Sequence, residues 1–150
     1  MRGRHEALVV VHRPSVDGPE FLLLLRSPEK QGYWHVVAGA VEEGEVPKEA
    51  GLRELGEEVA LDPTAGLLDL GDDLGYDVAD EPPEVQARFA PGVVRVQLHA
   101  YSAEAPPAWE PTLNEEHVTY RWATQSDAIE TLRYEEPREA VRRTAQADER

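Results

Sequence analysis

The stretch 39–61 constrains this chain most, because it combines a helical apolar pattern with a dense run of glutamates. We predict a helix over 47–59. At about 100° per residue, three glutamates share one sector of that helix and three apolar residues share another. The glutamates are Glu54, Glu57 and Glu58, and the apolar residues are Leu52, Leu55 and Val59. The pattern therefore predicts an amphipathic helix with a core side and an acidic side.

The acidic side of this helix allows two interpretations. Runs of charge are usually solvated surface, and acidic residues near a helix N-terminus are favoured by the helix dipole. Here the carboxylates lie in the C-terminal half, where like charges three and four positions apart repel, and Arg53 is spaced to pair with Glu57. A hard divalent cation bound by oxygen ligands would offset the repulsion. Without further information, both interpretations stay open.

The same helix is weak in isolation. Pro47 suits its first turn, but Val46 offers no oxygen to cap it. Gly51 and Gly56 each cost about 0.5–1 kcal/mol relative to alanine. We expect tertiary packing, pairing by Arg53 and a bound metal to hold it.

Composition limits the classes of function. The chain has 150 residues, which predicts a single domain over 1–150. It has no cysteine, which excludes disulfides, thiolate zinc sites and thiol nucleophiles. A net charge of −15 argues against coating nucleic acid, but not against a phosphate substrate, because bound cations reverse the local field. No stretch approaches the roughly 20 apolar residues of a membrane span, so we expect a soluble, cytoplasmic protein.

The remaining segments predict strands first and helices last. The expected strands are 7–13, 21–25, 33–39, one that starts at 66 and turns at 71–73, 93–105 and 117–124, and the expected helices are 125–134 and 137–147. The polar stretch 79–93 is either a binding loop or a surface insertion. This order suits an α/β protein with a mixed sheet covered by helices on both faces.

The spacing in 39–61 resembles the Nudix box, G-x5-E-x7-R-E-U-x-E-E-x-G-U, in which U is apolar. The matching residues are Gly39, Glu45, Arg53, Glu54, Leu55, Glu57, Glu58 and Leu61. Ala60 stands where the pattern has its last glycine, which affects only the loop geometry after the helix. The resemblance implies a Nudix fold, a mixed β-sheet sandwiched between helices (α/β/α), and a phosphoanhydride hydrolase that uses Mg²⁺ or Mn²⁺.

The resemblance also implies roles within the box. The metal ligands would be the carboxylates of Glu54, Glu57 and Glu58 with the carbonyl of Gly39. Glu54 or a neighbour such as Glu57 would also take a proton during catalysis. Glu45 and Arg53 would pair and fix the geometry between loop and helix.

Outside the box, the chain is similar to one bacterial branch of this family, the dihydroneopterin triphosphate pyrophosphatases. The similarity is carried by the segments 34–45, 88–95 and 116–122. It implies an extra metal ligand at Glu116, which without it would be one of a solvated pair with Glu115. It also implies a substrate pocket near the long loop at Asp80 or Glu81. The substrate-binding residues would be Arg26, Ala38 and Tyr134, although Tyr134 departs from the family's residue type.

The expected partner is a small nucleotide or pterin phosphate, with no nucleic acid and no membrane, in a monomer or homodimer. Two alternatives remain. One is a Nudix hydrolase acting on an oxidised nucleotide, a dinucleoside polyphosphate or an ADP-sugar. The other is a non-catalytic Nudix binding module, against which the complete acidic set argues.

Overall fold

A computed structural model describes residues 2–148 and contains one mixed sheet of seven strands. The strands are β1 (His5–Arg13), β2 (Glu20–Arg26), β3 (Trp34–His35), β4 (Val37–Ala40), β5 (Leu68–Asp77), β6 (Arg95–Glu104) and β7 (His117–Ala123). The helices are α1 (Pro47–Val59), α2 (Pro83–Gln86), α3 (Gln125–Thr131) and α4 (Glu135–Asp148), with 3-10 turns η1 (Pro28–Lys30) and η2 (Val78–Asp80). The strand order is β3-β2-β1-β6-β5, with β4 also pairing with β1 and β7 with β2.

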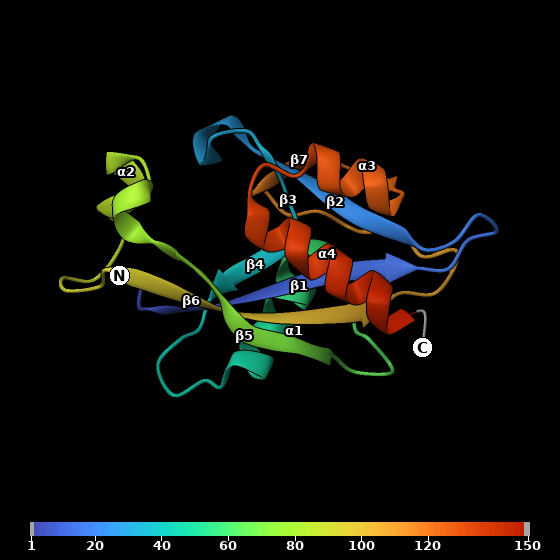
Figure 1. The fold of residues 1–150 in the computed structure, drawn as a ribbon, viewed down its shortest axis with the longest axis horizontal. Coiled ribbons are helices and arrows are strands. Elements are labelled where there is room, and N and C mark those ends of the chain that lie inside the picture. The colour runs from blue at the N-terminus through green and yellow to red at the C-terminus, as the bar shows by residue number, and fades with distance from the viewer. Residues whose placement is uncertain (1, 149–150) are drawn as a thin grey trace.

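Strand β1 is the centre of the sheet, because its apolar run buries side chains on both faces. It runs parallel to β6 and antiparallel to β4 and β2. Val9 packs in the core cluster beneath α1, whereas Leu8 and Val10 pack in the cluster beneath α3 and α4. Figure 1 shows α3 and α4 on the near face of the sheet and α1 behind it. The predicted sandwich is confirmed.

Two predicted strands differ from the structure. The segment 33–39 is split into β3, which pairs with β2, and β4, which pairs with β1. The predicted turn at 71–73 is wrong, because β5 continues through it. Gly71 takes a φ of 112° there, and its N–H donates to the carboxylate of Asp69. The strand thus absorbs the irregularity as shifts of register against β6.

The last two helices have other bounds than expected. α3 ends at Thr131 rather than 134, and α4 spans Glu135–Asp148 rather than 137–147. Thr124 caps α3 by accepting a hydrogen bond from the N–H of Asp127. No helix within residues 2–148 is long and apolar enough to cross a membrane.

Helix α1 has the predicted ends, but the face that it turns toward the sheet differs from the predicted one. Leu52 is 40% exposed, whereas Glu54 and Glu58 are buried. The cause is Gly51, which faces the sheet so closely that an added Cβ would lie 3.3 Å from the side chain of Val9. The helix packs through this glycine, and its two glutamates turn inward beside it. Leu55 and Val59 are buried in the core as predicted, so the prediction of separate core and acidic sides was wrong only for Leu52 and the two inward glutamates.

The two ends of α1 are also explained by the structure. Val46 provides no side-chain oxygen, and its own N–H donates instead to the carboxylate of Glu49 at 2.9 Å. At the other end, Ala60 adopts a left-handed conformation with φ of 60°. Glycine takes that conformation without strain, which accounts for the glycine of the box pattern at this position.

Candidate active site and metal centre

Two carboxylates of α1 meet a third from a distant part of the chain. Oxygens of Glu54, Glu58 and Glu116 all lie within 4.8 Å of one another. Glu58 is only 2% exposed, and its Oε2 has no hydrogen-bond partner among the described residues. Burial, together with Glu54 and Glu116, raises the pKa of Glu58 well above its usual value. The cluster therefore gathers carboxylate acceptors around a buried oxygen that has no hydrogen-bond partner within residues 2–148.

Glu116 reaches this cluster through the pairing of β7 with β2. Its carbonyl accepts a hydrogen bond from the N–H of Ser27 at 2.9 Å, and its N–H donates to Asn114 Oδ1 at 3.1 Å. Lys30 lies 3.8 Å from its carboxylate. These contacts fix the loop before β7 against the end of β2. The pairing of β7 with β2 therefore positions the carboxylate of Glu116 beside Glu54 and Glu58.

Glu57 lies outside the cluster of three. Its side chain is 58% exposed, and its Oε2 is 3.5 Å from Arg53 Nη1. It lines a shallow hollow together with Glu54, Glu115 and Glu116. The structure thus brings three of the predicted carboxylates together and leaves Glu57 at the rim, where its role as a ligand stays a prediction.

Arg53 ties the loop after β4 to α1. Its Nε and Nη2 donate to the two oxygens of Glu45 at 2.9 and 3.1 Å, and this bond lowers the pKa of Glu45. Nη2 also donates to the carbonyl of Ala40, and Nη1 donates to Glu54 Oε1 at 2.7 Å. The expected pair of Glu45 and Arg53 is present, and the same guanidinium orients Glu54.

Gly39 has a steric role that the sequence did not reveal. A Cβ at this position would collide with the carboxylate of Glu54. The glycine therefore lets Glu54 lie directly against β4. Its predicted role as a carbonyl ligand is a separate matter, which remains a prediction.

His117 is a further site residue that the sequence did not single out. Its Nε2 lies 3.7 Å from Glu58 Oε1, and neither ring nitrogen has a hydrogen-bond partner within residues 2–148. Burial, reinforced by the charge of Arg26, lowers the pKa of His117 to about 4. The ring is neutral at pH 7 and leaves the charge of Glu58 unbalanced. The feature of the sequence that could have identified His117 as a site residue is its position directly after Glu116.

A hard divalent cation fits this site. The donors are carboxylate oxygens from α1 and from the loop before β7, the ligand type that Mg²⁺ and Ca²⁺ prefer. A buried carboxylate oxygen without a partner is costly, and Glu58 carries one. A cation between the three carboxylates would satisfy that oxygen and offset their repulsion.

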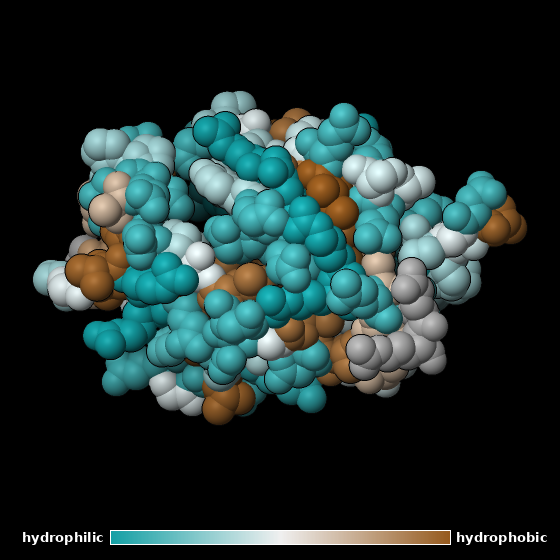
Figure 2. Space-filling model, viewed as in Figure 1, coloured by the Kyte–Doolittle hydropathy of each residue, from teal (hydrophilic) through white to brown (hydrophobic). Residues whose placement is uncertain are grey.

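A cavity of about 350 Å³ opens on the other face of the sheet. It brings together the three predicted substrate residues, Arg26, Ala38 and Tyr134, with Asp80 and Glu81 from the long loop. Figure 2 shows a hollow between the α2 region and the N-terminal end of α4 on this face. The predicted substrate residues thus share one cavity.

An aromatic and cationic wall forms one part of this cavity. The rings of Tyr33 and Tyr134 meet edge to face at 5.2 Å, and Arg26 lies 5.4 Å from the Tyr33 ring. Burial, followed by the charge of Arg26, lowers the pKa of His35 to about 3, so this lining residue is neutral. The wall suits a flat ring and an anionic group.

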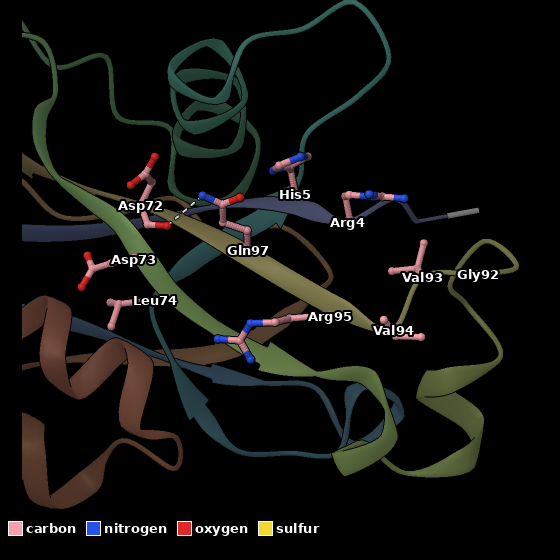
Figure 3. A pocket seen from close by; sticks show the side chains of 10 residues that line it. All are labelled: Arg4, His5, Asp72, Asp73, Leu74, Gly92, Val93, Val94, Arg95 and Gln97. Atoms are coloured by element: carbon pink, nitrogen blue, oxygen red, sulfur yellow. Dashed lines mark hydrogen bonds between the residues drawn. The ribbon is translucent and has the colours of Figure 1, made fainter.

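A separate cavity of about 400 Å³ lies near the start of β1 and is lined by residues of β5, of β6 and of the loop before β6 (Figure 3). Of its lining residues, His5 lies with Nδ1 3.0 Å from Nε2 of His99, and Gln97 donates to the carbonyl of Asp72 at 2.9 Å. None of the predicted site residues lines it. We assign it no role in the reaction.

The chain belongs to the NUDIX family, because the family model of the NUDIX domain matches residues 3–145. It is 25% identical over 145 residues to the dihydroneopterin triphosphate diphosphatase of Haemophilus influenzae, covering 95% of this chain and 87% of that protein. The enzyme of the same name from Escherichia coli K12 is 33% identical over 101 residues, 67% of each chain. The E. coli dihydroneopterin triphosphate pyrophosphohydrolase structure superposes with a TM-score of 0.80 at 26% identity, covering 96% of both chains. The predicted family, fold and branch of relatives are confirmed.

Proposed function

We propose that this protein is a Mg²⁺-dependent hydrolase that cleaves a phosphoanhydride bond of a pterin or nucleoside triphosphate. Dihydroneopterin triphosphate, with pyrophosphate release, is the first candidate substrate. The observation that carries the proposal is the cluster of Glu54, Glu58 and Glu116, in which the buried Glu58 Oε2 has no hydrogen-bond partner among the described residues. The named relatives support the choice of substrate.

The metal would be held by the carboxylates of Glu54, Glu58 and Glu116, joined by Glu57 and the Gly39 carbonyl. Bound Mg²⁺ would supply positive charge against the charge that develops on the phosphates. Glu54 would also accept a proton from the attacking water, or Glu57 would do so from the rim. No covalent nucleophile is required.

Arg53 and Glu45 would act as positioning residues. The bidentate pair holds the loop after β4 against α1, and the third contact of Arg53 fixes the carboxylate of Glu54. A proton acceptor works only when its oxygen lies in the correct place. The pair therefore contributes through Glu54 rather than by touching the substrate.

Arg26 would connect the two parts of the site. It stands at the end of β2 opposite His117, the neighbour of Glu116, and it also lines the cavity. Its Nε has no hydrogen-bond partner among the described residues. We assign it to a phosphate oxygen of a substrate whose ring lies against Tyr33, Ala38 and Tyr134.

A substrate panel with product analysis tests this function. The panel is dihydroneopterin triphosphate, GTP, an oxidised nucleoside triphosphate, a dinucleoside polyphosphate and ADP-ribose, each with and without Mg²⁺. We expect Mg²⁺-dependent pyrophosphate release, fastest from dihydroneopterin triphosphate. Release of AMP with a sugar phosphate would identify an ADP-sugar hydrolase instead, and no turnover of any compound would identify a binding module.

A further inference from the structure

A buried carboxylate lies beside the apolar floor of the cavity. Leu8, Ala38 and Leu98 line it from β1, β4 and β6. Glu6 lies two positions before Leu8 on the same face of β1, and it is only 6% exposed. Because a carboxylate is costly to bury, its presence on this floor needs a physical reason.

The two nearest polar contacts of Glu6 both involve Oε1. The hydroxyl of Tyr76 donates to Oε1 at 2.6 Å, and Arg2 Nη2 lies 3.2 Å from that oxygen. Over residues 2–148, no hydrogen bond reaches Oε2. A buried carboxylate that lines a cavity therefore has an acceptor left for a ligand.

A second carboxylate stands on the same side of the cavity. Glu81, from the loop 79–93, lines it and is half-buried. Burial and the neighbouring Glu6 raise the pKa of Glu81. The long loop thus adds a second acceptor near the first.

The polar groups of the cavity are distributed across the sheet. Arg26 stands on β2, whereas Glu6 stands on β1 and its partner Tyr76 on β5. In the strand order, β1 separates β2 from β6 and β5. Arg2, Arg88 and Arg95 line the cavity beyond β2 as well, and Arg2 pairs with Glu6. A ligand lying across the cavity would meet Arg26 on the β2 side and the acceptor oxygens of Glu6 and Glu81 beyond it. That arrangement fits an anion joined to a ring with N–H donors.

We propose that Glu6 determines specificity by accepting a hydrogen bond from the 2-amino group of a 2-amino-4-oxopyrimidine ring. Pterins and guanine share that ring, whereas hypoxanthine lacks the amino group. Glu81 is the second acceptor for the same edge. The inference rests on the proposed function for the orientation of the substrate, with its phosphates toward Arg26.

Matched ligands that differ at this amino group test the proposal. The affinities of GMP and IMP, and of pterin and lumazine, are measured by calorimetry, and the turnover of GTP and ITP is measured with Mg²⁺. We expect the wild-type protein to favour the amino compound by about 10-fold or more, the value of a hydrogen bond to a charged group. The Glu6→Gln variant should bring that ratio close to one.

The matched control is Glu84→Gln, the same chemical change at an exposed residue of α2 that does not line the cavity. It should leave every ratio unchanged. Thermal unfolding of Glu6→Gln checks its fold, and the wild-type ratios need no variant at all.

The proposal is overturned if the wild-type protein binds none of the four ligands GMP, IMP, pterin and lumazine. It is also overturned if the wild-type protein binds the two compounds of each pair with equal affinity. A ratio that persists in Glu6→Gln also overturns it. If the ratios hold and nothing is hydrolysed, only the proposed function fails. If triphosphates are hydrolysed without discrimination, only the role of Glu6 fails.

Discussion

The cluster of Glu54, Glu58 and Glu116 and the cavity lined by Ala38 lie on the two sides of β4. The two regions also arise differently from the sequence. Gly39 faces Glu54 and α1, while its neighbour Ala38 lines the cavity. Two of the three clustered carboxylates come from one helix, whereas the cavity is lined from β1, β2, β4, β5, β6 and the long loop. The proposed chemistry is thus encoded locally, and the proposed specificity is spread over the chain.

The two regions also balance charge differently. In the cavity, Glu6 pairs with Arg2, and Asp77 pairs with Arg95 at 3.1 Å. In the cluster, Glu58 faces two carboxylates and a neutral histidine. We therefore expect the cluster, but not the cavity, to depend on a bound cation for its stability.

The largest expected effect is that of Glu58→Gln. It should lower turnover by at least about 100-fold, the scale of losing a positioned acid–base or ligand group. It should also stabilise the metal-free protein. The pKa of Glu58 is raised in the folded state, so ionising it above its unfolded value of about 4.5 costs folding free energy, and glutamine removes that cost. Initial rates and thermal unfolding in EDTA measure the two effects.

The control for this variant is Glu115→Gln, which neutralises an exposed neighbour of Glu116 outside the cluster. Its rate should stay within a few-fold of wild type. A Glu58→Gln protein with near-normal rates would place the chemistry elsewhere.

Arg53→Lys should separate positioning from charge. Lysine keeps the charge but cannot reproduce the fork to Glu45 together with the bonds to Glu54 and Ala40. We expect roughly 10- to 100-fold slower turnover and a loss of about 1–3 kcal/mol in unfolding free energy, measured by urea denaturation.

The control for this variant is Arg142→Lys on α4, where the arginine forms exposed pairs with Glu135 and Glu139. This substitution should lower the unfolding free energy by less than about 1 kcal/mol. Equal losses in both variants would contradict the role of Arg53.

A pair of glycine substitutions tests the close approach of α1 to β4. Gly39→Ala should displace the Glu54 carboxylate and slow turnover by about 10-fold or more, because the new Cβ would occupy its place. Gly56→Ala meets no atom within 4 Å and should stabilise the helix by about 0.5–1 kcal/mol. Kinetics and urea denaturation of both variants measure this, and an active Gly39→Ala enzyme would show that Glu54 need not lie there.

A further prediction concerns pH and the cavity. The pKa of His35 falls from 6.5 to about 3 on folding, so the unfolded chain binds its proton first as pH drops. Stability is then lost below about pH 6.5, by about 2 kcal/mol between pH 7 and pH 5. Urea denaturation at both pH values should show a smaller loss in His35→Gln. An identical loss in the variant would mean that other groups cause it.

The sequence predicted what is local and missed what depends on packing. The ends of α1 follow from spacing within one segment, and the partnership of Glu45 with Arg53 follows from the resemblance of that segment to the Nudix box. The rotation of α1 did not, because it depends on Gly51 meeting Val9 across the sheet. The burial and contacts of Glu6 and His117 likewise depend on residues far away in the chain, such as Tyr76 and Glu58. No local sequence pattern predicts such contacts.

The most direct test of the division between cluster and cavity is a calorimetric titration of the protein with Mg²⁺. Wild type and Glu6→Gln should both bind Mg²⁺ at millimolar or tighter concentration, since Glu6 lies in the cavity, whereas Glu58→Gln should bind it much more weakly. Absence of binding to wild type, or equal binding to wild type and Glu58→Gln, would contradict a metal centre at Glu54, Glu58 and Glu116.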